Sequence, residues 1–330
     1  MSGFFMQMRK NFITAALLLL FSSIAFANTA TQKILANFES YPFAQMTVAH
    51  RAQAGIESRI FPENSLAAIH LAINRGVSII EVDPRLTADG HYVLVHDETL
   101  DRTTNVQSLF PELSEKDGKF KGKVPVSKLT LDQIKQLTLT DGFDGQTHRV
   151  ATLREALEIA KDRVFLDLDL KEIDVDKLTA LVKEFGKDNL MAYNSNAKKL
   201  KEVTDKTGIM PLPINLAIAK GGNPIEDFHK FQKMWGHNFK IMHTYMSDIT
   251  PELVALADKH KVRLWINTLN DADGAAERFD YSLWKSYLAS GANVFQSDMA
   301  IELTRFISLR NACLTLKNVP SCDVFITHKP

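Results

Sequence analysis

The chain has 330 residues with 39 basic and 39 acidic side chains, so its formal net charge at neutral pH is zero. Proteins that bind nucleic acids usually carry a clear excess of basic residues, and this balance argues against a nucleic-acid partner. The length is sufficient for one large hydrophobic core, and the sequence has no low-complexity run or short-period repeat. We therefore expect a single folded domain.

Residues 1–27 have the pattern of a secretory signal. Arg9 and Lys10 precede an apolar run from Phe12 to Phe21, and the segment ends in Ala25-Phe-Ala27. The apolar run is shorter than the roughly 20 residues that a membrane-spanning helix needs. We expect cleavage after Ala27 and export to the periplasm or the medium without a stable membrane anchor. The folded domain should then occupy residues 28–330.

Three apolar runs in the first third of the chain end in ionisable groups. They cover residues 46–49, 77–80 and 92–95, and their β-branched and apolar composition is typical of buried strands in a parallel sheet. The groups that follow them are His50-Arg51, Glu81-Val-Asp83 and His96-Asp97. Between the first two runs, Asn64-Ser65 is expected to begin a helix that ends near Gly76.

The connection from Asp83 to Val93 is too short for a helical crossover, which takes about a dozen residues. Thr87-Ala-Asp-Gly90 instead predicts a tight turn. One interpretation is a plain antiparallel hairpin, which would place His96 at the far end of the sheet from Glu81. The other is an extended return before a third barrel strand, and the residues alone leave both open.

The segment 106–150 is polar and rich in glycine near its middle, with a short helix expected around residues 131–137. It is interpreted either as an excursion over the mouth of a site or as a solvated loop. Thr152-Leu-Arg-Glu155 has the pattern of a capping box and should begin a helix that runs to Lys161.

The run that starts at Val164 alternates apolar and charged residues. Because side chains in a strand alternate with a period of two, Asp167, Asp169 and Lys171 should share one face. Further strands are expected at 190–193, 209–216, 239–244, which ends near His243, 262–268 and 294–296. With the earlier runs this gives nine candidates, so we expect that either 209–216 or 239–244 is not a full strand of an eight-stranded barrel.

Cys313 and Cys322 are the only cysteines, nine positions apart near the end of the chain. In an exported protein such a pair predicts a disulfide.

The residue types at the strand ends indicate phosphodiester chemistry. Carboxylates such as those of Glu81 and Asp83, about 7 Å apart along one strand, are hard oxygen ligands that suit Mg²⁺ or Ca²⁺. The imidazoles of His50 and His96 would then be available for proton transfer, while basic side chains hold an anionic oxygen.

The motifs resemble those of the glycerophosphodiester phosphodiesterase family, within the superfamily of phospholipase C-like phosphodiesterases. The matching segments are His50-Arg51, Pro62-Glu-Asn-Ser65, Glu81-Val-Asp83, Thr87-Ala-Asp-Gly90, His96-Asp97, Arg102-Thr-Thr104, Leu166–Lys171, Leu264–Thr268 and Gln296-Ser-Asp298. The resemblance implies an α/β fold, a TIM-type (β/α)8 barrel that is irregular between strands 2 and 3. It also implies a role for each of ten residues: His50 and His96 as the acid and base, Glu81, Asp83 and Asp169 as metal ligands, Arg51 and Lys171 as phosphate contacts, Trp265 as a wall for the glycerol or alcohol part, and Glu63 and Asn64 in support.

Several features depart from the family pattern. Ala52 stands where the family usually has Gly, Asp169 replaces the usual Glu, and the last motif lacks its customary Thr and Pro. The loop from Arg51 to Pro62, with Glu57 and Arg59, is also longer than is common. The shorter reach of Asp169 bears on the choice of metal, and the longer loop bears on the choice of substrate.

We expect a hydrolase that uses one divalent cation, Mg²⁺ or Ca²⁺, to split a small-molecule glycerophosphodiester into glycerol 3-phosphate and an alcohol. An alternative in the same fold is phospholipase D-like action on the head groups of lysophospholipids or sphingolipids. A third hypothesis is an exported protein that binds a phosphodiester without turnover. The sequence gives no indication of the oligomeric state.

Overall fold

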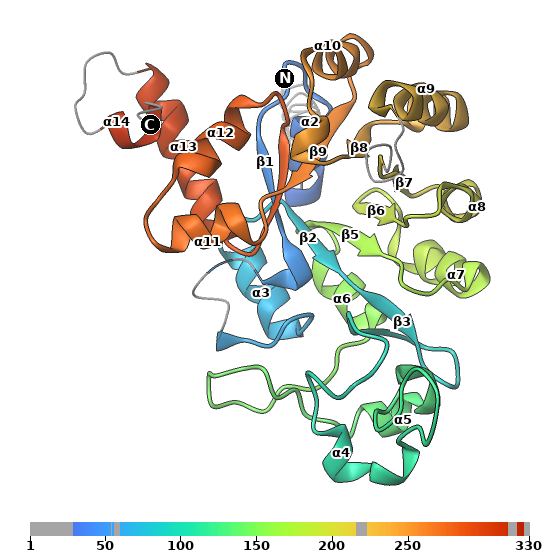
Figure 1. Cartoon of the computed structure of the whole chain (residues 1–330). Helices are drawn as coiled ribbons and strands as arrows, with labels where there is room; N and C mark the ends of the chain where they lie inside the picture. The colour runs from blue at the N-terminus through green and yellow to red at the C-terminus, as the bar shows by residue number, and fades with distance from the viewer. Residues whose placement is uncertain (1–28, 54, 56–59, 216–222, 316–321, 327–330) are drawn as a thin grey trace, which may run out of the picture.

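The computed structural model describes residues 29–53, 55, 60–215, 223–315 and 322–326, and Figure 1 shows their arrangement. The expected signal segment, and Glu57 and Arg59 of the long loop, lie outside these ranges. Within the described residues, no helix is both long enough and apolar enough to cross a membrane.

Eight parallel strands form the barrel, in the order β7-β6-β5-β2-β1-β10-β9-β8. A parallel bridge between Ile214 and His243 joins the two ends of this order, so the ring is nearly closed. The strands are β1 (Met46–Ala49), β2 (Ile79–Val82), β5 (Phe165–Asp169), β6 (Leu190–Tyr193), β7 (Met210–Leu212), β8 (Ile241–His243), β9 (Arg263–Asn267) and β10 (Val294–Ser297). The predicted TIM-type barrel is therefore confirmed.

Helices surround the strands, as Figure 1 shows. The predicted helix starts are confirmed at Ser65, whose side chain accepts a hydrogen bond from the Ala68 amide, and at Thr152, which forms a capping box with Glu155. The helices are α2 (Ala30–Glu39), α3 (Leu66–Asn74), α4 (Val106–Leu109), α5 (Leu131–Ile134), α6 (Leu153–Ala160), α7 (Val175–Phe185), α8 (Ala197–Thr207), α9 (Pro224–Trp235), α10 (Pro251–His260), α11 (Asp271–Glu277), α12 (Ser282–Ala289), α13 (Ala300–Thr315) and α14 (Asp323–Ile326).

The prediction that either 209–216 or 239–244 is not a full strand is wrong, because both provide barrel strands, β7 and β8. The surplus candidate is 92–95. Its residues form β4 (Tyr92–Leu94), which pairs antiparallel with β3 (Pro84–Leu86) in a separate two-stranded sheet. The interpretation of 92–95 as a parallel barrel strand is therefore wrong. An apolar composition indicates only that a strand is buried on both faces. The residues of β4 are buried in this way although β4 does not lie in the barrel.

The β3–β4 hairpin also corrects the expected consequence of a hairpin. β3 follows β2 after the single residue Asp83, so the hairpin projects beyond the carboxyl end of β2, and β4 runs back towards the barrel. The amide of Val95 donates to the carbonyl of Asp83, with 2.9 Å between N and O. His96 thus returns to the same end of the sheet as Glu81 instead of the opposite end.

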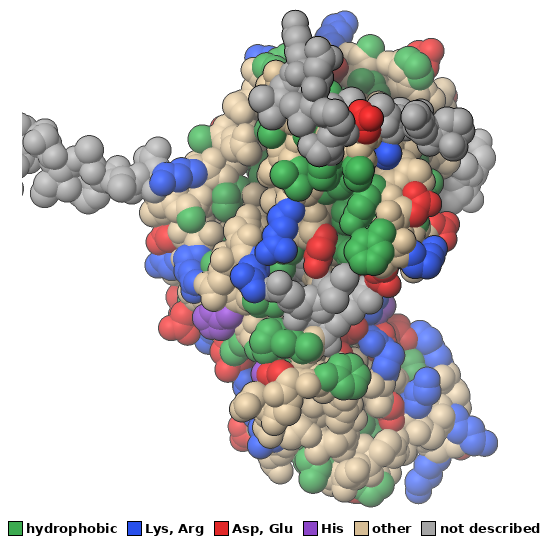
Figure 2. Space-filling view, turned by 90° about the vertical axis from the view of Figure 1, so that its left-hand side faces the viewer, with side chains coloured by type: hydrophobic (Ala, Val, Ile, Leu, Met, Phe, Trp, Pro, Cys, Tyr) green, Lys and Arg blue, Asp and Glu red, His purple; other side chains and the backbone are tan. Residues whose placement is uncertain are grey.

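The segment that begins in β4 forms a compact lobe with its own apolar core. Its buried side chains are Val93, Val95, Leu100, Val106, Val124, Val126, Leu129, Ile134, Leu137 and Val150. Figure 1 shows this lobe, with α4 and α5, at the lower end of the molecule, and Figure 2 shows the same region as a separate bulge below the barrel. The segment is therefore not a solvated loop.

The barrel interior has an apolar floor. Eight strands contribute Met46, Val48, Ile79, Phe165, Met191, Leu212, Ile241, Trp265 and Val294, and Phe38 of α2 packs against them. The ring of Phe38 stacks on Phe165 with 6.1 Å between centroids, and Arg263 binds the end of α2 through the carbonyls of Asn37 and Phe38. Most of these residues lie at or near the start of their strands, as Ile79, Phe165 and Val294 do, so α2 closes the amino-terminal end of the barrel.

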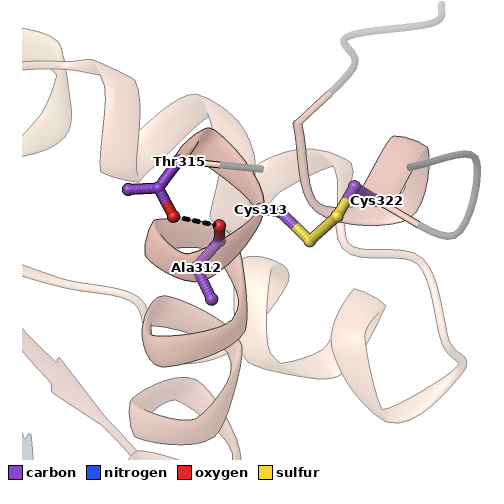
Figure 3. The surroundings of a disulfide bond; sticks show 4 residues. All are labelled: Ala312, Cys313, Thr315 and Cys322. Atoms are coloured by element: carbon purple, nitrogen blue, oxygen red, sulfur yellow. Dashed lines mark hydrogen bonds between the residues drawn. A yellow bond between two sulfur atoms is a disulfide. The ribbon is translucent and has the colours of Figure 1, made fainter. Parts of the chain in front are cut away.

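Cys313 and Cys322 form the predicted disulfide, which joins α13 to α14 with 5.4 Å between the Cα atoms. Figure 3 shows the bond beside the last turn of α13.

Candidate active site

The candidate site lies above the apolar floor, and Leu212 and Trp265 of the floor also line it. Because inward-facing side chains recur every second residue, the next inward position on each strand lies one level nearer the carboxyl ends. These positions are mostly polar, and they line a cavity of about 130 Å³. The lining residues are His50, Glu81, His96, Asp167, Asp169, Tyr193, Leu212, His243, Trp265, Asn267 and Gln296. Among the described residues of segment 106–150, none lines this cavity.

Glu81, Asp83 and Asp169 form the acidic side of the site. One oxygen from each lies within 4.8 Å of the other two. Two oxygens bound to one Ca²⁺ lie at most about 5 Å apart, since each Ca–O bond is about 2.3–2.6 Å long. The three carboxylates could therefore hold one metal ion.

The charge balance of these acids favours a cation. Burial raises the pKa of Glu81 well above its usual value, and the charges of Asp83 and Asp169 raise it further. Burial also raises the pKa of Asp169. For Asp83, burial opposes ionisation, but Lys171 and a hydrogen bond from Asn64 outweigh it and lower the pKa.

Lys171 lies among these carboxylates. Its ammonium is 3.1 Å from Oδ1 of Asp83 and donates a hydrogen bond to Asp169. The sequence correctly places its side chain on the same face of the β5 segment as Asp169. Lys171 is thus positioned beside the acids, where it can also reach an anionic ligand.

Asn64 and Glu63 hold the site from the loop before α3. Asn64 Nδ2 donates to Asp83 Oδ2 at 2.8 Å, and its Oδ1 accepts from the Asp83 amide at 3.1 Å. Glu63 bridges two guanidinium groups, with 3.2 Å to Arg51 and 2.6 Å to Arg102. The side chains of Glu63 and Asn64 therefore fix the positions of an acid and of two cations.

Arg51 follows β1 in a tight turn. Its amide donates to Oε2 of Glu81 at 2.7 Å, and both Arg51 and the buried Ala52 have positive φ, 51° and 60°. The Nε atom of Arg51 has no hydrogen-bond partner among the described residues and lies 4.0 Å from Oδ2 of Asp83. A buried guanidinium N–H without a hydrogen-bond partner thus lies next to the acids.

The two predicted catalytic histidines line the same cavity, and a carboxylate holds each one. His50 Nδ1 lies 2.8 Å from Oδ1 of Asp298, and His96 Nδ1 lies 2.8 Å from Oδ1 of Asp97. Arg102 donates to Asp97 at 2.6 Å and holds the pKa of that carboxyl far below its usual range. With Nδ1 of each ring engaged, Nε2 is the nitrogen that can exchange a proton with a ligand.

Sequence reasoning gave no role to Asp298 or to Arg102, although both lie in matched motifs. Asp298 lies two positions after Gln296, so its place on the inward face of the β10 segment could have been read from the strand period. The contact between Asp298 and His50 could not be predicted in this way, because it depends on how β10 pairs with β1.

Aromatic rings from β6, β8 and β9 line another part of the cavity. Trp265 is 1% exposed and donates from Nε1 to Oδ1 of Asn267 at 3.1 Å. The ring of His243 packs between those of Trp265 and Tyr193, with centroid distances of 6.0 and 5.6 Å. Burial lowers the pKa of His243 to about 4, so this imidazole is neutral at physiological pH.

All ten predicted site residues therefore lie together. His50, His96, Glu81, Asp169 and Trp265 line the cavity. The other five contact these residues or one another, and they are Arg51, Glu63, Asn64, Asp83 and Lys171.

Comparisons with known proteins agree with this geometry. The model of the Glycerophosphoryl diester phosphodiesterase family matches residues 50–280. A glycerophosphodiester phosphodiesterase of Caldanaerobacter subterraneus is 32% identical over 232 residues, which cover 67% of this chain and 84% of that protein. Human glycerophosphodiester phosphodiesterase 1 is 29% identical over 217 residues, which cover 61% of this chain and 58% of the human protein.

Solved structures share the fold. A glycerophosphoryl diester phosphodiesterase of Parabacteroides distasonis superposes with a TM-score of 0.67 at 20% identity, covering 90% of this chain and 96% of that one. A phosphodiesterase of Oleispira antarctica, in complex with its product sn-glycerol-3-phosphate, gives 0.60 at 22% identity, covering 80% and 97%. At these identities the likeness supports the barrel alone.

Proposed function

Because this chain belongs to the glycerophosphoryl diester phosphodiesterase family and is an enzyme of that class, we propose that it hydrolyses glycerophosphodiesters, such as deacylated phospholipids, to sn-glycerol 3-phosphate and an alcohol. The observation that carries this proposal is the convergence of two carboxylate-held imidazoles and three clustered acids on one cavity. The product bound to the Oleispira antarctica relative has the chemistry expected of this reaction.

We propose that His50 and His96 are the acid and base. One imidazole accepts the proton of the attacking oxygen, which belongs to water or to the neighbouring glycerol hydroxyl. As the bond between phosphorus and the alcohol oxygen breaks, the other imidazole donates a proton to that oxygen. Asp298 and Asp97 keep each ring in one orientation and stabilise its protonated form, as a carboxylate partner does for histidine in other hydrolases.

Arg51 and Lys171 are proposed to bind the phosphate oxygens. The unsatisfied Nε of Arg51 and the position of Lys171 between Asp83 and Asp169 support this assignment. Trp265, which also lines the cavity, would contact the carbon atoms of the glycerol or alcohol part.

The reaction is proposed to require one divalent cation, Mg²⁺ or Ca²⁺, held by Glu81, Asp83 and Asp169. The donor set fits, because three carboxylate oxygens lie within the separation that one hard cation spans. When bound, the cation supplies a positive charge that neutralises the phosphate oxygens.

The test uses the chain from Asn28, treated with a chelator and then resupplied with Mg²⁺ or Ca²⁺. We expect metal-restored release of glycerol phosphate from glycerophosphocholine and glycerophosphoethanolamine. His50→Ala and His96→Ala should each lower turnover by about a hundredfold or more. His70→Ala, on the exposed face of α3, is the matched control and should keep full activity.

Retained activity in both site variants would refute the assignment of the histidines. Turnover of lysophosphatidylcholine in place of glycerophosphodiesters would instead favour phospholipase D-like action. Tight binding of glycerophosphocholine without turnover by the metal-loaded protein would favour a binding protein.

We also propose that the chain is exported after cleavage at Ala27. The pattern of residues 1–27 supports this, and so does the disulfide, since such bonds persist in oxidising compartments. Amino-terminal sequencing of the protein from an expressing bacterium should give Asn28 as the first residue, and retention of Met1 would contradict the proposal.

A further inference from the structure

Asp167 is a buried acid that the proposed chemistry does not use. It lies in β5, opposite Glu81 of β2 and two residues before Asp169. Its side chain is 2% exposed and lines the cavity. The group of carboxylates that could hold a metal ion within the described residues contains Glu81, Asp83 and Asp169 but not Asp167. Asp167 therefore needs a different explanation.

The Oδ1 atom of Asp167 has no hydrogen-bond partner among the described residues. Three donors near the cavity have other partners: the Lys171 ammonium binds Asp83 and Asp169, Trp265 Nε1 binds Asn267, and Gln296 Nε2 binds Glu81 at 3.4 Å. Burying a polar group without a partner is unfavourable, because it loses its hydrogen bonds to water. A ligand hydroxyl that reached Asp167 would restore one.

Asp167 also lies deeper in the barrel than the proposed phosphate site. Asp169 and Lys171 follow it along the chain, and two residues of a strand span about 7 Å. A ligand whose phosphate lies beside Lys171 and whose other end extends towards the floor therefore reaches Asp167 with that other end.

The cavity has the size and the walls for a short polyol. Its volume is about 130 Å³, and a cavity of about 150 Å³ takes up benzene, which has six heavy atoms, as glycerol does. Leu212, Tyr193 and Trp265 offer apolar surface to carbon atoms, and Asp167 offers an acceptor. The quaternary ammonium of choline has no hydrogen to donate and would leave Oδ1 without a hydrogen bond.

We infer that Asp167 is a specificity-determining residue that hydrogen-bonds to the glycerol hydroxyl farthest from the phosphate. This inference rests on the proposed function, because it assigns the cavity to the glycerol part of the substrate. It also implies that a diester binds with its glycerol part inside the cavity and its variable alcohol towards the open side of the site.

The test measures binding by calorimetry to the metal-loaded protein. The ligands are sn-glycerol 3-phosphate, 2-hydroxypropyl phosphate, which lacks the terminal hydroxyl, and phosphocholine. The wild-type protein should bind sn-glycerol 3-phosphate about fivefold or more tightly than 2-hydroxypropyl phosphate, because a ligand without the terminal hydroxyl leaves the buried oxygen of Asp167 without a hydrogen bond.

Asp167→Ala should abolish this preference by weakening the binding of sn-glycerol 3-phosphate, with little change for 2-hydroxypropyl phosphate. Asp167→Asn keeps the shape and a polar oxygen, so it should retain part of the preference and also guards against misfolding of the alanine variant. Asp176→Ala, at an exposed position of α7, is the control and should bind all three ligands like the wild type.

Equal weakening of both glycerol-type ligands would overturn the inference, since a purely structural role predicts it. Tighter binding of phosphocholine than of sn-glycerol 3-phosphate, lost in Asp167→Ala, would overturn it in favour of a cation site. Turnover of glycerophosphocholine by the wild type, measured in parallel, distinguishes a failure of this inference from a failure of the proposed function. If turnover occurs and the preference survives in Asp167→Ala, only the inference fails; if the wild type shows neither turnover nor binding, the proposed function fails with it.

Discussion

Lowering the pH should destabilise this protein through His243 in particular. The side chain is 9% exposed at the end of β8, and burial lowers its pKa to about 4 from an ordinary value of 6.5. Between these two values the unfolded chain binds a proton at this histidine and the folded protein does not. The resulting stabilisation of the folded state is therefore fully present above about pH 6.5 and is lost as the pH falls towards 4.

The size of the effect follows from the shift. One pKa unit corresponds to 1.36 kcal/mol, so the whole shift is equivalent to roughly 3 kcal/mol, of which about 2 kcal/mol should be lost between pH 7 and pH 5. The assay is urea unfolding of the wild type and of His243→Gln, which does not titrate, at both pH values. The free energy of unfolding of the wild type should fall by about 2 kcal/mol more than that of the variant.

His70→Gln is the control, because His70 is an exposed histidine on α3. Its difference from the wild type should be the same at pH 7 and pH 5. The reasoning would be refuted if the difference between wild type and His243→Gln were also independent of pH, or if it changed in favour of the wild type at pH 5.

Two further predictions concern the turn after β1 and the support of His50. Ala52→Gly should raise the free energy of unfolding by about 1 kcal/mol, because Ala52 has a φ of 60°, which glycine adopts without a steric cost; an unchanged or lower melting temperature would contradict this. Asp298→Ala should lower kcat about tenfold or more with little change in KM, because it removes the carboxylate that orients His50 but no expected substrate contact. Steady-state kinetics with glycerophosphocholine test this, and a raised KM at unchanged kcat would assign Asp298 to substrate binding instead.

Local sequence patterns predicted most of the barrel strands and the polar residues at their ends, whereas the barrel itself and the roles of the ten site residues came from the resemblance to a known family. Each barrel strand is a short apolar run, and the polar residue that follows it marks the carboxyl end. The period of two then places Asp169 and Lys171 on one face, as the structure has them. These rules use only neighbouring residues in the sequence, and they succeed where the structure depends on contacts between such neighbours.

The same rules failed where the structure depends on pairing between residues that are far apart in the sequence. Burial of β4 between the barrel helices and the lobe core gives it the composition of a barrel strand. The pairs between His50 and Asp298 and between Glu63 and Arg102 join residues 248 and 39 positions apart. No local pattern indicates such a pair, because it exists only once the ring of strands is closed and the lobe is packed.

The bridge from Glu63 to Arg102 has a consequence for how the lobe can evolve. Arg102 belongs to the segment that leads into the lobe, and it holds both Glu63 of the barrel and Asp97, the partner of His96. Residues 106–150 of the lobe, which the structure describes in full, do not line the cavity, so the outer part of the lobe can change in length or composition without moving the imidazole. A lobe transplanted from a relative would have to bring an arginine that meets Glu63, or the host barrel would lose the alignment of His96.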